Sequence, residues 1–177
     1  MADSQRLLEI YLADHLAAAT AGAALAHRSA KSNADSEIGD FLQRLTAEIH
    51  EDRRTLRWVV AELGLDESKV KNVVAWAAEK VARLKPNGQV RGYSPLSRVL
   101  ELEALSVGVA GKLALWQALE GLPDIDQRLP GVDLEHLVQR ARRQRADIEE
   151  HRIRAARTAF VAGAGSERKL AGSEPLP

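Results

Sequence analysis

Ionisable side chains interrupt several apolar stripes of this 177-residue chain at helical spacing. Asp52 falls between Ile49 and Leu56, on a face that is otherwise lined by apolar residues. Glu103 lies in a stretch that is apolar on nearly every side. Because an unpaired ion in a protein interior is very costly, each such residue needs a partner there. The residues that we predict to form a buried polar cluster are His15, Glu48, Asp52, Glu103, Arg145, Glu149 and Arg152.

Carboxylates and arginines in one cluster favour an ion-pair network. Arg145 and Arg152 fall within the apolar stripe of the last long helical segment, with Glu149 beside them. A guanidinium is planar and can pair with a carboxylate through two hydrogen bonds, and His15 can serve as a further partner. Such a network adds little net stability, because desolvation offsets much of the Coulomb attraction. Loss of one member, however, leaves its partner unpaired.

Four long helical segments must position these residues. Apolar side chains recur every three to four positions in each segment, as they do in amphipathic helices. Ser36 and Asp133 are suited to be N-caps, Gly64 follows a helix end, and Pro95 suits a first helical turn. The predicted helices cover residues 3–30, 36–63, 96–119 and 134–162.

The lengths of the connections predict how these helices are arranged. Only a few residues join the first helix to the second, so these two should be antiparallel neighbours. About thirty residues separate the second helix from the third, and they contain a further amphipathic segment, residues 67–84. At about 1.5 Å per helical residue, such a connection can return along a bundle. We therefore predict an all-α fold: a four-helix bundle of two antiparallel hairpins, with an extra helix in the crossover.

The predicted helix over residues 96–119 has two apolar surfaces. One holds Glu103 together with Leu100 and Val107, and we expect it to face the interior. The second is formed by Leu102, Val109, Leu113 and Trp116. We expect the crossover helix or a second subunit to cover this second surface. A homo-oligomer could also form around Trp58, which should lie on the outer face of the second helix.

Composition limits the classes of partner and compartment. Lys plus Arg and Asp plus Glu each number 25, so a net charge of zero gives no electrostatic case for nucleic acid or membrane partners. The basic run at residues 140–145 indicates a solvated helix face, with phosphate binding as the alternative. The chain has no cysteine, and its first residues lack the features of a signal peptide. We expect one cytoplasmic domain, residues 1–162, with a flexible tail at residues 163–177.

Two stretches of the chain resemble a known family. AEIHEDRRTLRWVVAELG at residues 47–64 and ELEALSVGVAGKLALWQAL at residues 101–119 resemble the ferritin-like superfamily. The nearest relatives in style are bacterial stress-associated ferritin-like proteins. The second stretch is also similar to an uncharacterised actinobacterial family of helical bundles. The resemblance covers about residues 4–162 in helix order and spacing.

Active members of that superfamily hold two iron or manganese ions between glutamates and Glu-x-x-His pairs. Glu48 and Glu103 match two of the glutamates, but Glu51 stands where the histidine after Glu48 is required. Arg145 and Arg152 would repel metal ions. These departures from the family pattern predict a bundle with no functional metal centre and no cofactor, in a non-enzymatic structural or interaction role. The resemblance implies an association of that role with stress. The alternative is a divergent iron or manganese protein with oxidase or storage activity, with the ligands His15, Glu48, Asp52, Glu103 and Glu149.

Overall fold

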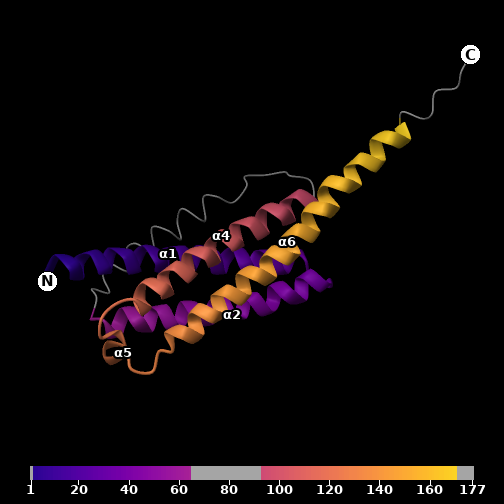
Figure 1. Cartoon of the computed structure of the whole chain (residues 1–177). Helices are drawn as coiled ribbons and strands as arrows, with labels where there is room; N and C mark the ends of the chain where they lie inside the picture. The colour runs from indigo at the N-terminus through magenta and orange to yellow at the C-terminus, as the bar shows by residue number, and fades with distance from the viewer. Residues whose placement is uncertain (1, 65–92, 171–177) are drawn as a thin grey trace, which may run out of the picture.

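The computed structural model describes residues 2–64 and 93–170, with side chains over residues 3–64 and 93–161. Every regular element in these ranges is an α-helix, so the protein is all-α over the part described. The long helices are α1 (Ala2–Ser32), α2 (Glu37–Glu62), α4 (Pro95–Glu120) and α6 (Leu134–Leu170), and α5 (Ile125–Arg128) is a single turn (Figure 1). The predicted bounds agree closely with these, except at the end of α6.

The long helices form two antiparallel hairpins, α1–α2 and α4–α6, as predicted. Figure 1 shows α1 and α6 running in one direction and α2 and α4 in the other. Each hairpin packs closely along its length, and α1 of the first also lies against α4 of the second. By contrast, α2 and α6 approach each other at few points. The side of the bundle between α2 and α6 is therefore the most open.

The turn between α1 and α2 is fixed by a serine cap and a glycine. The Ser36 hydroxyl accepts a hydrogen bond from the backbone N–H of Gly39 at 3.2 Å and donates one to the carbonyl of Asn33 at 2.6 Å. A Cβ atom on Gly39 would lie only 2.1 Å from that same carbonyl oxygen. Only glycine therefore allows the turn to close this tightly. Ser94 caps α4 in the same way, by accepting from the N–H of Ser97.

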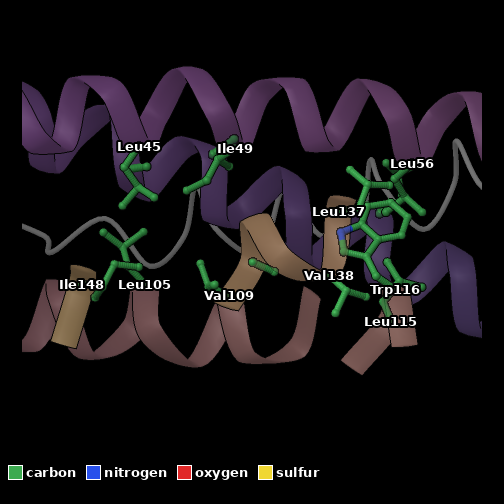
Figure 2. Close-up of a cluster of buried hydrophobic side chains, with 14 of the residues drawn as sticks. Leu45, Ile49, Leu56, Leu105, Val109, Leu115, Trp116, Leu137, Val138 and Ile148 are labelled. Carbon is green, nitrogen blue, oxygen red and sulfur yellow. The ribbon is translucent and has the colours of Figure 1, made fainter. Parts of the chain in front are cut away.

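The apolar core lies between the four long helices α1, α2, α4 and α6. Figure 2 shows Leu45 of α2 pointing toward Leu105 of α4 and Ile148 of α6. Further along the bundle, the large ring of Trp116 lies beside Leu56. All of these side chains are buried, and they belong to one continuous cluster. Burial of apolar area of this kind supplies the main favourable term in folding.

The structure corrects the predicted orientation of α4. The surface expected to face the interior is exposed, with Leu100 at 55% and Val107 at 72% of full accessibility. The second surface is the buried one, and Leu102, Val109 and Trp116 lie in the core. That surface therefore cannot be the predicted contact with a second subunit. Both faces of α4 are apolar, so periodicity alone could not choose between them.

Two other predictions concern the ends of the described ranges. The predicted crossover helix, residues 67–84, lies outside the described residues. Helix α6 continues to Leu170, so residues 163–170, which the sequence analysis placed in a flexible tail, are helical. Residues 171–177 also lie outside the described part. None of the helices searched, all within the described residues, has an apolar run long enough to cross a membrane.

Candidate functional site

Asp52 is the centre of a buried polar network. It lies on α2 between Ile49 and Leu56, as predicted, and is only 3% exposed. Its Oδ2 atom accepts a hydrogen bond from the Lys112 ammonium, and its Oδ1 atom accepts one from Nη2 of Arg140. Both contacts are also ion pairs between largely buried side chains. A buried carboxylate is thus held between two cations.

A glutamine completes the network. Gln144 is buried, and its Oε1 atom accepts a hydrogen bond from Lys112. Its Nε2 atom donates to Oε2 of Glu48 at 2.7 Å and lies 3.5 Å from Oδ2 of Asp52. Glu48 and Asp52 supply negative charge beside the cations Lys112 and Arg140, and Glu51 also pairs with Arg140 at 3.0 Å. Contact between opposite charges limits the penalty of removing these ionisable groups from water.

Three helices supply these side chains in a simple geometric pattern. On α2, Glu48 and Asp52 are four residues apart, and on α6 the same spacing separates Arg140 from Gln144. Residues at this spacing lie on one face of a helix, one turn above the other. On α4, Lys112 lies on the buried face, which places its amine between the other two pairs. The network therefore joins the first hairpin to the second.

Burial dominates the acid–base behaviour of Lys112. Loss of hydration lowers the pKa of its ammonium group from the usual value, and the negative charge of Asp52 opposes that change. Arg140, which lies on the other side of Asp52, lowers the pKa of Lys112 further. The amine is consequently easier to deprotonate than a surface lysine.

Three of the predicted cluster residues form a separate contact near the surface. Arg152 donates through Nε to Glu149 at 2.7 Å, and its Nη1 atom lies 3.4 Å from Oε1 of Glu103. The side chain of Glu103 is 48% exposed, so it is not a buried charge as predicted. Arg145 is also exposed. The prediction of one buried cluster containing Glu103, Arg145, Glu149 and Arg152 is therefore wrong, although Arg152 does pair with Glu103.

His15 is half-buried but does not join the network. Its ring packs edge-on against Tyr11, with the ring centres 4.5 Å apart. Within the described residues no hydrogen bond links it to Asp52 or Lys112, although all three line one hollow of about 260 Å³ between α1, α2 and α4. Burial lowers the pKa of the His15 imidazole, and the nearby Asp14 opposes this.

The donor set does not fit a di-metal centre. Over the described residues no three histidine or carboxylate side chains converge as metal ligands would. Glu103 lies in the surface contact, away from Glu48 and Asp52, and Glu149 accompanies it. Asp52 is instead in contact with two cations, which would repel a metal ion. The alternative ligand set of His15, Glu48, Asp52, Glu103 and Glu149 is thus not assembled in this structure.

Sequence reasoning missed three members of the network. Lys112 was not singled out, and Arg140 was placed in a basic run on a solvated helix face. The signal was present, because Lys112 follows Val109 by three residues and precedes Trp116 by four. Once the face of α4 that carries Val109 is known to be buried, Lys112 must be buried with it. Gln144 was overlooked because it carries no charge.

Comparison with known proteins gives no relative for this chain. No protein-family model, no curated protein and no solved structure shows a significant match.

Proposed function

We propose that this protein is a ferritin-like four-helix bundle that works without a metal centre, in a non-enzymatic structural or interaction role. The observation that supports this proposal is the Asp52 network, in which Lys112 and Arg140 surround a deeply buried carboxylate. The antiparallel hairpins are compatible with a ferritin-like arrangement. No step of chemistry is assigned to the site.

The network supplies within the chain what a metal ion would otherwise supply. A cation at the centre of a bundle neutralises inward-facing carboxylates and ties several helices together. Here an ammonium and a guanidinium do so, and they are covalently part of α4 and α6. Their charges lie where a divalent ion would have to bind, so direct repulsion opposes metal uptake.

Metal analysis after expression in medium supplemented with iron and manganese tests this proposal. We expect far less than one tightly held ion per chain in elemental analysis of the purified protein. We also expect no ferroxidase signal when ferrous iron is added in air. A content of about two ions per chain, as in di-metal carboxylate bundles, would contradict the proposal if Asp52→Asn abolished it.

A further inference from the structure

A second feature of the molecule is an open cleft between α2 and the start of α6. It has a volume of about 530 Å³ and lies on the side where these two helices diverge. Binding sites for small molecules are commonly clefts of about 300–1,000 Å³. The side chains that line it and carry the argument are Glu51, Arg54, Trp58, Asp133, His136 and Arg140.

The acceptors of this cleft are already engaged. Glu51 forms an ion pair with Nη1 of Arg140 at 3.0 Å. Asp133 accepts a hydrogen bond from the backbone N–H of His136 at 2.8 Å, at the beginning of α6. Glu51 is therefore ion-paired within the protein, and Asp133 serves as the N-cap of α6.

The donors of the cleft are not all engaged. Arg54 is exposed, and in the described part of the chain its guanidinium has no hydrogen bond, ion pair or ring contact. The Nε–H of Arg140 is buried and likewise has no acceptor among the described residues. Positively charged donors that lack an acceptor favour an anion. A guanidinium in particular matches the two oxygens of a carboxylate.

An aromatic ring shares the cleft with this guanidinium. Trp58 lies one helical turn after Arg54 on α2 and is 38% exposed. Indole offers a flat apolar face on which another planar ring can stack. A half-exposed tryptophan beside an unpaired arginine is therefore matched to a ligand with a ring at one end and a negative charge at the other.

We propose that this cleft binds a small aromatic carboxylate, with its ring against Trp58 and its carboxylate on Arg54. The site goes beyond the structural role proposed above, and it does not depend on metal content. His136 lies across the cleft on the first turn of α6, where it can add a hydrogen bond to the bound carboxylate. Arg140 joins the floor of the cleft to the Asp52 network.

Calorimetric titration with two matched probes tests the proposal. Naphthalene-2-carboxylate carries the ring and the charge, whereas naphthalene-2-carboxamide carries the ring alone. We expect the carboxylate to bind about tenfold more tightly, as one charge-assisted contact predicts. Arg54→Gln should abolish that preference, and Trp58→Ala should weaken both probes. Arg57→Gln is the matched control, since Arg57 is an exposed arginine of the same helix that does not line the cleft.

Three results would overturn the proposal. The first is equal affinity of the intact protein for the two probes. The second is a carboxylate preference that survives Arg54→Gln, or that Arg57→Gln removes equally. The third is a dimer, detected by sedimentation at the titration concentration, that Trp58→Ala dissociates. That last result would show that a second copy of the chain covers the cleft. Metal analysis of the same sample reports separately on the structural role.

Discussion

At the scale of single residues, Asp52 decides the energetics of the interior. The ions around it stabilise the fold little more than apolar residues of the same size would, because each ion loses its hydration on burial. The stability lost when one ion is removed is larger than the net stability that the whole network contributes. Lys112 and Arg140 are both largely buried and both rely on the same carboxylate. Removing that carboxylate leaves two cations with half of their partners missing.

We therefore expect Asp52→Asn to lower the free energy of unfolding by about 3–5 kcal/mol, the range found when one partner of a buried ion pair is removed. Urea denaturation at neutral pH measures the change. Glu62→Gln is the control, because Glu62 is an exposed carboxylate of the same helix, and it should change stability by less than about 0.5 kcal/mol. A loss below about 1 kcal/mol for Asp52→Asn would show that Asp52 is not buried with its partners.

Two histidines make stability depend on pH. Burial is the main cause that lowers the pKa of His15 and His151 from 6.5, and Arg154 lowers that of His151 further. Below pH 6.5 the unfolded chain therefore binds protons at these residues more readily than the folded chain. Their contribution to stability is complete above pH 6.5 and is lost as the pH falls toward the folded pKa values.

The ring of His151 stacks on Phe41, with the ring centres 4.1 Å apart, so His151→Phe should keep the packing and remove the titration. We expect the stability of this variant to fall less than that of the parent between about pH 7.5 and pH 5.5. Urea midpoints at both pH values give the comparison. Equal losses in the two proteins would mean that His151 does not titrate in this window.

The residue scale also shows what sequence could predict. Asp52 was identified correctly, because its position inside the regular apolar stripe of α2 requires it to face the interior. Arg145 was wrongly placed inside, since Gln144 and Arg145 both fall between Ala141 and Ile148 in the stripe of α6. One residue of rotation, about 100° on a helix, exchanges their positions. Packing against the neighbouring helices determines that rotation, and this packing cannot be deduced from the periodicity of one helix.

At the scale of elements, the rotation of α4 has a direct test. Leu102 is buried against the other helices, whereas Leu100, two residues earlier, is 55% exposed. Leu102→Ala should cost about 2–5 kcal/mol of stability, as is usual for a leucine in a core. Leu100→Ala should cost far less, because little buried area is lost. The same urea experiment measures both, and a reversed order would restore the orientation expected from sequence.

The turn between α1 and α2 provides a second test at this scale. Gly39→Ala forces a methyl group against the Asn33 carbonyl and should lower stability by about 1–3 kcal/mol. At Gly111 an added Cβ atom meets nothing within 4 Å. Gly111→Ala should therefore raise stability by up to about 1 kcal/mol, because alanine favours a helix interior over glycine. Thermal unfolding of both variants separates the two effects, and equal changes would contradict them.

Helix boundaries were easier to predict than helix faces. Ser36 and Asp133 were predicted to be N-caps from residue type and position, and each accepts a hydrogen bond from the backbone N–H three residues later. Capping is a local interaction, so it is visible in the sequence. The burial of a face depends on what packs against it.

At the scale of the whole molecule, polar contacts at separate places along the bundle tie the hairpins together. The Asp52 network is one, and a second lies near the turn of the first hairpin. There Asn33 accepts a hydrogen bond from Nε of Arg98 and donates one to the hydroxyl of Tyr93, both at 2.7 Å. Asp52 lies fifteen residues into α2, or about 22 Å from its start. The two ties are thus well separated along the bundle.

If the bundle unfolds as one cooperative unit, the effects of breaking both ties should add. We expect the combined Asn33→Ala and Asp52→Asn variant to lose the sum of the two single losses, to within about 0.5 kcal/mol. Urea unfolding followed by circular dichroism and by tryptophan fluorescence provides the measurement. Transitions that differ between the two probes, or a sum that fails by more than about 1 kcal/mol, would show that the hairpins unfold separately.

The arrangement of the whole molecule was the most predictable part of the fold. The short and long connections between the helices predicted two hairpins joined by a long crossover. This prediction does not depend on which face each helix buries. The sequence predicted that a buried ion-pair network exists, but it identified only two of the residues that form it, Glu48 and Asp52. Its other members sit on α4 and α6, the helices whose rotation the sequence left undetermined.

The length of α6 affects how the molecule moves in solution. Thirty-seven helical residues extend about 55 Å, whereas a spherical domain of this chain length would be about 40 Å across. Figure 1 shows the end of α6 passing beyond the other helices. The described part of the molecule is therefore elongated along the bundle, and this shape favours anisotropic tumbling. Its rotation about the long axis is faster than its end-over-end rotation.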